Sequence, residues 1–287
     1  MSETISRDDG LLETCVARAV AGDRGALEEV LRAVQDDVYN LAVRMLWCPE
    51  DAADASQEIL MRLVTRLSTF RGESAFRTWV YRVATNHLLN VRRRRVEREE
   101  ITFARFGESL AVGLVDLPAP IASQPDQALL EEEVKVGCTQ GMLLCLDRDH
   151  RVAYVLGEVF ELPGDIAADV LEIPPATYRK RLSRARERLR AFMSGHCGLI
   201  NPDAPCRCSR RITHAISLGI VRPDRLLFAG AGPALKPSPE VSRGVEEMTE
   251  LYQIAGLYRS HPAYPTPEHL QQGVLGALEH GAFSLLR

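Results

Sequence analysis

Residues 174 to 189 read PPATYRKRLSRARERL, and this stretch decides how the second half of the chain is interpreted. Tyr178, Leu182, Ala185 and Leu189 recur at spacings of four, three and four, which predicts a helix with one buried apolar face. The positions between them are mostly cationic: Arg179, Lys180, Arg181, Arg184, Arg186, Arg188 and Arg190, against the single acid Glu187. The outward face of this helix is therefore strongly basic.

A shorter amphipathic segment precedes the basic helix and contains the small pair Ala167-Ala168. Pro174-Pro175 then suits the approach to the first turn of a second helix. A helix, a short turn and a basic helix form the helix-turn-helix arrangement, whose second helix enters the major groove of DNA. The alternative is a surface helix whose arginines are merely solvated. The motif by itself predicts DNA binding and nothing more specific.

The whole chain has 287 residues and a formal net charge of −4, so acidic segments offset the basic ones. A chain of this length can hold two or three small domains with real cores. No apolar run reaches the length of a membrane span, and the polar start lacks the regions of a signal peptide. We therefore expect a cytoplasmic protein with no membrane partner. Seven cysteines in such a chain favour free thiols or metal ligands over a disulfide framework.

Apolar residues at three- and four-residue spacing predict an all-α fold. Helical patterns fill residues 11–95, the N-terminal domain. Between residues 96 and 126 the periodicity fades and Pro118, Pro120 and Pro125 interrupt any regular element, which predicts a linker. Helicity resumes over residues 127–193, a second domain that ends in the basic helix. Residues 194–287 form a Cys-containing, mostly helical C-terminal extension.

The segment 51–67 carries a buried stripe and, opposite it, a more exposed face. Asp54, Gln57 and Glu58 share that exposed face through their three- and four-residue spacings. Such a face can bind a partner protein. The alternative is a helix whose acidic residues simply favour its N-terminal dipole.

The next helix, from residue 76, presents a polar strip that includes Arg82, Asn86 and Asn90 at four-residue steps. Arginine and asparagine can hydrogen-bond phosphates and base edges. Trp79 and Tyr81 lie near this strip, and unpaired bases stack on aromatic rings, although both side chains can equally belong to the core.

Two flanking segments extend this pattern. The helix ends in an arginine run that includes Arg92 and Arg93 and attracts phosphate, or else simply favours the helix dipole. The loop before the helix, with Phe70 and Arg71, is placed where it can hold a flipped base, or else is an ordinary connection.

Together these segments resemble bacterial RNA polymerase sigma factors of the extracytoplasmic-function group. The resemblance rests on DAADASQE at 51–58, FRG at 70–72, FRTWVYRVATN at 76–86 and the basic helix at 177–189. Their order and spacing agree with the family, and the resemblance covers about residues 11 to 193. Two departures leave the promoter preference open. Ala176 stands where many relatives carry glycine, and GDIAAD at 164–169 keeps only part of the usual first-helix pattern.

The resemblance implies a two-domain initiation factor that binds core RNA polymerase and promoter DNA, with an anti-sigma factor as a further candidate partner. Asp54, Gln57 and Glu58 would hold the polymerase clamp. The −10 element would be melted and read by Phe70, Arg71, Trp79, Tyr81, Arg82, Asn86, Asn90, Arg92 and Arg93. The −35 element would be read as duplex by Thr177, Arg179, Lys180, Arg181 and Arg184. The linker would thread through the polymerase. Melting needs no catalytic group and no cofactor, because capture of an unstacked base offsets the cost of opening the duplex.

The extension lies beyond this minimal architecture. His196, Cys197, Cys206 and Cys208 can complete a tetrahedral zinc site, although their spacing is not that of a standard zinc finger. Reduced structural or redox-responsive thiols are the alternative. The four other cysteines lie in helical contexts and are interpreted as packing residues: Cys15, Cys48, Cys138 and Cys145. The added length and clustered thiols suggest a regulatory extension, against a passive packing one.

The main rival interpretation is a stand-alone helix-turn-helix regulator that binds operators without polymerase. It leaves Asp54, Gln57, Glu58 and the helix at 76–90 without a role. An enzyme is disfavoured, because the sequence has no phosphate-binding loop, no nucleophile motif and no paired-histidine metal helix.

Overall fold

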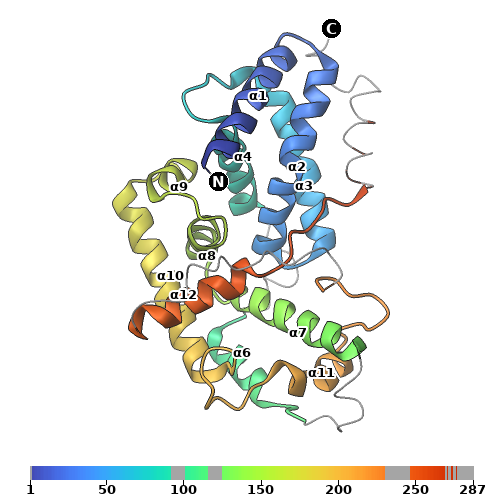
Figure 1. The fold of residues 1–287 in the computed structure, drawn as a ribbon, viewed down its shortest axis with the longest axis vertical. Coiled ribbons are helices and arrows are strands. Elements are labelled where there is room, and N and C mark those ends of the chain that lie inside the picture. Colours follow the sequence, from blue (N-terminus) through green and yellow to red (C-terminus); the bar gives the residue numbers. More distant parts are fainter. Residues whose placement is uncertain are drawn as a thin grey trace. The chain divides into compact units, whose positions relative to one another are not determined.

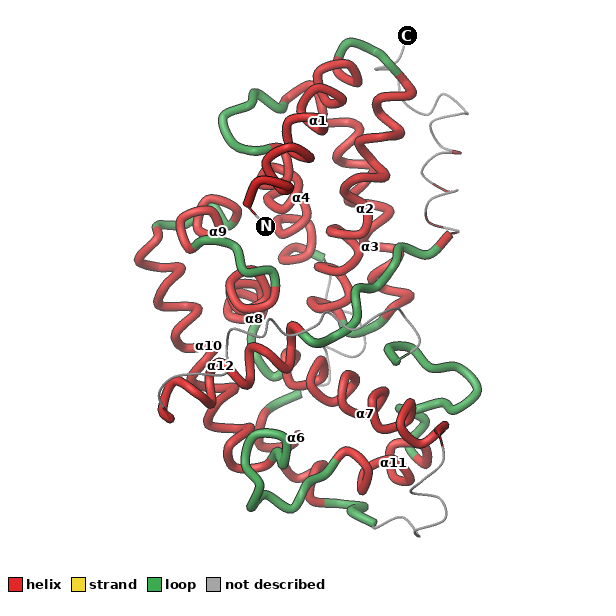
Figure 2. Tube along the Cα trace, in the orientation of Figure 1, coloured by secondary structure: helices red, strands yellow, loops and turns green. Residues whose placement is uncertain are grey.

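The computed structural model describes residues 2–91, 101–115, 125–229 and 246–268, together with residues 270, 273 and 276. Throughout these residues the chain forms helices and loops and no strand (Figure 2). An isolated β-bridge pairs the backbones of Cys197 and Cys206, whose thiols are both free. The predicted all-α class is confirmed. None of the described helices is long and apolar enough to cross a membrane.

The chain divides into two compact units. The first comprises Met1–Val91, Asp165–Pro175 and Pro265–Arg287, and the second comprises Arg92–Gly164 and Ala176–Tyr264. The boundaries expected from sequence near residues 95, 126 and 193 stay predictions.

Four helices and a short 3₁₀ turn form the body of the first unit (Figure 1): α1 (Ser2–Val20), α2 (Arg24–Leu46), α3 (Pro49–Arg66), η1 (Leu67–Thr69) and α4 (Phe76–Asn90). Local signals set their ends. The Asp23 carboxylate caps α2 by accepting the Ala26 N–H at 3.0 Å, and Trp47 closes α2 in the left-handed conformation. Pro49 then occupies the first turn of α3. The predicted apolar stripes of α3 and α4 are buried.

The first unit also contains α9 (Gly164–Val170), whose residues from Asp165 onward belong to it. The turn after α9 is a Schellman motif: the Ile173 N–H donates to the Ala168 carbonyl and the Glu172 N–H to that of Asp169, both at 3.1 Å. Glu172 lies in the left-handed region with φ 53°, where glycine is usual.

The second unit contains α6 (Phe103–Ala111), α7 (Pro125–Leu144), α8 (Arg148–Tyr154), the π-helical turn η2 (Val155–Val159), α10 (Pro175–His196, from Ala176 onward), α11 (Cys208–Ser217) and α12 (Glu246–Arg259). Helix α6 corrects the expectation that no regular element lies between residues 96 and 126. Thr102 caps it by accepting the Arg105 N–H, and Phe103 and Phe106 pack on Phe192 of α10 with ring centroids 5.1 and 5.8 Å away. A helix as short as α6 is stable here because its first turn is capped and its apolar side chains pack on another helix.

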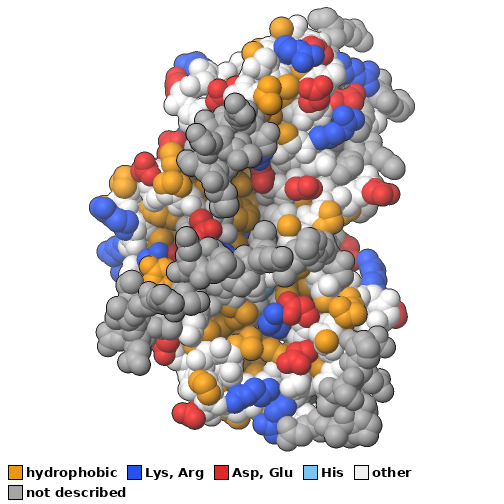
Figure 3. Space-filling view, viewed as in Figure 1, with side chains coloured by type: hydrophobic (Ala, Val, Ile, Leu, Met, Phe, Trp, Pro, Cys, Tyr) orange, Lys and Arg blue, Asp and Glu red, His pale blue; other side chains and the backbone are white. Residues whose placement is uncertain are grey.

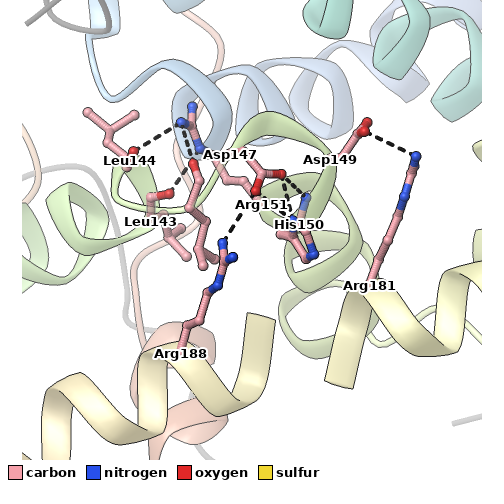
Figure 4. Close-up of polar contacts among 9 residues, drawn as sticks. Leu143, Leu144, Asp147, Asp149, His150, Arg151, Arg181 and Arg188 are labelled. Atoms are coloured by element: carbon pink, nitrogen blue, oxygen red, sulfur yellow. Dashed lines mark hydrogen bonds and ion pairs between the residues drawn. The ribbon is translucent and has the colours of Figure 1, made fainter. Parts of the chain in front are cut away.

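Two buried charged side chains, Arg151 and Glu133, form hydrogen bonds that stabilise α7 and its surroundings. The Arg151 guanidinium donates to the carbonyls of Leu143, Leu144 and Leu146, which satisfies backbone acceptors at and just beyond the C-terminal end of the helix (Figure 4). The Glu133 carboxylate accepts the N–H groups of three consecutive residues, 227 to 229, at 2.7 to 2.8 Å. These contacts fix a loop far along the chain to α7.

Candidate nucleic-acid interface

The basic helix α10 buries the face that its spacing predicts. Tyr178, Leu182, Ala185 and Leu189 are all buried, and Phe192 and Met193 continue the stripe. The Tyr178 hydroxyl donates to the Ala153 carbonyl at 3.2 Å. A Cβ at Gly157 would lie 2.4 Å from the Tyr178 hydroxyl oxygen, so the π-helical turn approaches α10 closely because residue 157 has no side chain.

Four of the seven cations on α10 are paired with acids of the same unit. Arg181 lies 3.0 Å from Asp149, and Arg188 lies 3.4 Å from Asp147, both at the start of α8 (Figure 4). On the other flank Arg186 binds the nearly buried Glu158, and Arg190 lies 3.6 Å from Glu250. The four pairs hold both sides of α10. Sequence analysis missed these acids, whose pairing depends on tertiary structure.

The remaining cations lie on the outward face. Thr177, Arg179, Lys180 and Arg184 are exposed, and within the described ranges no ion pair or hydrogen bond engages their side chains. Figure 3 shows Lys and Arg side chains along the outer edge of α10. Arg181 differs from the other four residues predicted to read the −35 element, because it is half-buried and tied to Asp149.

The three predicted polymerase-binding residues are exposed along α3: Asp54, Gln57 and Glu58. Glu58 lies 3.7 Å from Nε2 of the buried His87. Burial lowers the pKa of His87, the positive charge of Arg62 lowers it further, and Glu58 opposes both effects. His87 therefore favours the neutral form behind the acidic face.

An aromatic cluster joins the loop before α4 to the helix. The Phe70 ring lies 5.2 Å from that of Phe76 and 5.7 Å from that of Trp79, and Phe76 and Trp79 stack at 5.6 Å. Phe76 is buried, whereas Phe70 and Trp79 are half-buried and Arg71 is exposed. Trp79 is thus partly a core residue with one side left accessible.

The polar strip of α4 is occupied by carboxylates of the same unit. Arg82 donates to Asp169 at 2.7 Å and Asn86 donates to Glu172 at 3.1 Å. Asn90 donates to the backbone carbonyl of Asn86 at 2.7 Å. The donors of Arg82 and Asn86 are therefore already oriented toward anionic oxygens, the same class of acceptor that a DNA phosphate presents.

Three more residues are assigned to the −10 element. Tyr81 is half-buried, and burial raises the pKa of its hydroxyl, which stays protonated at neutral pH. Arg92 and Arg93 lie outside the described residues.

The proposed zinc ligands are only partly brought together. Cys197, Cys206 and Cys208 line one small cavity, and the fourth sulfur on its wall belongs to Cys138 of α7. His196 does not line this cavity; its ring stacks on Phe192 at 4.5 Å. As they stand, no three His, Cys, Asp or Glu side chains among the described residues are arranged to hold a metal ion. Sequence analysis missed Cys138 because it lies on a helix far from the other three.

Known proteins resemble the chain over both units. The family described as Sigma-70 region 2 matches residues 30–98, and Sigma-70, region 4 matches residues 137–189. The RNA polymerase sigma-H factor of Pseudomonas aeruginosa is 32% identical over 179 residues, which cover 61% of this chain and 89% of that protein. The ECF RNA polymerase sigma-E factor of Haemophilus influenzae is 30% identical over 182 residues, covering 62% and 92%.

Among solved structures, the sigma factor RpoE in a co-crystal with the anti-sigma factor NepR from Bartonella quintana aligns with a TM-score of 0.40 and 20% identity, over 58% of this chain and 95% of that one. The assignment follows from the sequence relatives, which match over most of their own length, and from the two sigma region families, which match this chain one after the other. The chain belongs to the extracytoplasmic-function group of bacterial RNA polymerase sigma factors.

Proposed function

We propose that this sigma factor, which acts in transcription initiation, divides the work among three surfaces. The exposed face of α3 at Asp54, Gln57 and Glu58 docks on core RNA polymerase. The loop at Phe70 and the polar strip of α4 read the −10 element, and α10 reads the −35 element as duplex. The observation that carries the −35 assignment is the outward stripe of Thr177, Lys180 and Arg184 on a helix whose flanking arginines are held by acids.

We propose that the chain acts in the cytoplasm and has a non-catalytic role. Stacking of an unpaired base on an aromatic ring is worth about 1–3 kcal/mol, which offsets part of the cost of opening a base pair. Phe70 and Trp79 offer half-buried rings for that purpose. Arg82 and Asn86 would exchange the carboxylates of Asp169 and Glu172 for DNA. No cofactor takes part in these steps.

Run-off transcription tests the proposal. Purified core RNA polymerase is assayed on a promoter library with and without the full chain, and initiation at defined −35 and −10 elements is expected. Lys180→Ala with Arg184→Ala should reduce initiation through the −35 element, while Arg190→Ala serves as a control at a paired position. Sequence-specific DNA binding without initiation would instead favour the stand-alone regulator.

A contact within the first unit supports a regulatory role for the C-terminal end of the extension. The N–H and the hydroxyl of Thr266 donate to Asp36 at 3.0 and 2.6 Å, and Leu270 is buried. A Cβ at Gly273 would lie 3.3 Å from Nε2 of Gln57, so the backbone there lies against a predicted polymerase-binding side chain. This segment would restrain polymerase binding from within the chain.

Truncation after Tyr264 removes the segment and spares the second unit. We expect the truncated chain to bind core polymerase more tightly than the full chain, and Asp36→Asn to have a smaller effect in the same direction. Equal or weaker binding by the truncated chain, with its thermal unfolding unchanged, would show that the segment supports packing instead. An anti-sigma factor that binds this acidic face would compete with the same segment.

A further inference from the structure

Four cysteines converge on one cavity in the second unit. Cys138 comes from α7, Cys197 follows directly after α10, Cys206 lies in the loop, and Cys208 begins α11. Cys197 and Cys206 are buried, and the other two are half-buried. The loop between Cys197 and Cys206 is closed by a backbone β-bridge between these two residues, with a 3.1 Å hydrogen bond from the Gly198 N–H to the Cys206 carbonyl.

Backbone packing fixes this loop. A Cβ at Gly198 would lie 2.3 Å from the Cys206 carbonyl oxygen, so only glycine allows the approach. The Arg207 guanidinium donates to the carbonyls of Pro202, Ala204 and Cys206. The close approach at Gly198 and the hydrogen bonds from Arg207 thus hold the loop that carries Cys197 and Cys206.

The cavity among the sulfurs has a volume of about 20 Å³. Protein cores rarely leave voids among well-packed side chains, and a void of this size holds about one water-sized sphere. A void of this size has room for a single ion and is too small for an iron–sulfur cluster.

The surroundings match a metal bound by four thiolates. Zn²⁺ with four thiolates carries a net charge of −2. The cavity wall includes Arg211 and also Lys135, whose ammonium is paired with Glu132, so Arg211 is the cation that can balance the complex. Arg211 is buried and donates to the Ser109 carbonyl at 2.9 Å, so its charge is fixed near the sulfurs. A bare cation would be repelled here, whereas the dianionic complex is stabilised.

We propose that Cys138, Cys197, Cys206 and Cys208 bind one structural Zn²⁺ ion. Each thiol gives up its proton as it forms a bond to the metal, so binding releases four protons. Zn–S bonds of about 2.3 Å place neighbouring sulfurs about 3.8 Å apart. The structure does not hold the sulfurs in that arrangement, so metal binding would require the four cysteine side chains to move toward one another. His196 is not a ligand.

Metal analysis of the full chain tests the site, and its readout does not depend on transcription. The protein, purified with a reducing agent, is expected to contain about one zinc per chain. Replacement by Co²⁺ should give the visible absorption of a tetrahedral thiolate site. Cys138→Ser should weaken zinc binding by at least about 100-fold in competition with a chelator, because a coordinating ligand is lost. Cys145→Ser and His196→Ala should keep the metal.

If Cys138→Ser does not fold, the Co²⁺ spectrum of the unaltered chain still decides the question. The proposal is overturned if the folded, reduced chain takes up neither Zn²⁺ nor Co²⁺ and all seven thiols react after unfolding. It is also overturned by a disulfide among the four, by bound iron and sulfide, or by loss of zinc in His196→Ala.

Discussion

The pairing of arginines on α10 predicts how DNA binding responds to salt. The sequence offers seven cations, but Arg181, Arg186, Arg188 and Arg190 are engaged by acids. Each phosphate neutralised by a free cation contributes about 0.9 to the slope of log K against log salt. Lys180 and Arg184 together should therefore contribute about 1.8 to that slope. Replacing both with alanine would reduce the salt sensitivity by that amount.

The magnitude is large enough to measure. A fourfold increase in salt should cost the unaltered protein about 12-fold more affinity than the double variant loses, from two phosphate contacts at about 0.9 each. The assay is fluorescence anisotropy of a labelled promoter carrying the −35 element, with reconstituted holoenzyme titrated at several KCl concentrations. The promoter is one selected in the run-off library.

A matched control removes a charge pair without changing the net charge: Arg181→Ala with Asp149→Ala. Because exposed pairs are worth at most about 1 kcal/mol, this variant should keep its fold, which circular dichroism would verify. We expect its salt slope to equal that of the unaltered protein. If this variant lowers the slope by about 0.9, or if the Lys180 and Arg184 variant leaves it unchanged, the division into paired and free cations is refuted.

Three further predictions concern stability, each measured by urea unfolding of the full chain. Gly157→Ala should destabilise it by about 1–3 kcal/mol, because its methyl group would lie 2.4 Å from the Tyr178 hydroxyl, whereas Gly256→Ala, with open space around it, should gain up to about 1 kcal/mol. Glu133→Gln leaves a buried N–H without an acceptor and should cost about 2–4 kcal/mol, against about 0.5 or less for Glu131→Gln. The free energy of unfolding should fall as the pH drops from about 7 through the lowered pKa of His87, since the unfolded imidazole takes up its proton first, near pH 6.5; His87→Gln should flatten this slope.

Much of the fold is readable from local pattern. The faces of α3, α4 and α10 follow their apolar spacing, because each helix buries one stripe against its neighbours. Helix α6 escaped detection for the converse reason. It is short, the proline-containing segment 118–125 follows it, and it packs on Phe192, which lies far along the chain.

The site is less readable because its charges act in pairs. The sequence spacing of Arg181 does not distinguish it from Arg184, yet Arg181 pairs with Asp149 whereas Arg184 is exposed to solvent. The same holds for sulfur: Cys138 has the sequence context of a packing residue, and only the packing of α7 against α11 brings it to the loop. Contacts with residues far along the chain determine the partners of both Arg181 and Cys138, and the helical spacing of residues in the sequence does not reveal such contacts.

The position of the four cysteines gives the extension a structural reason to act on promoter recognition. Cys197 directly follows the last residue of α10, so a metal bound there would anchor one end of the helix proposed to read the −35 element. The other ligands would tie that end to α7 and α11, and Phe192 already holds it to α6. A helix fixed at its C-terminal end by zinc and along its flanks by ion pairs meets DNA with little orientational freedom left to lose. Loss of the metal should then weaken binding to the −35 element even though no ligand contacts DNA, since the ordering cost would return at the moment of binding.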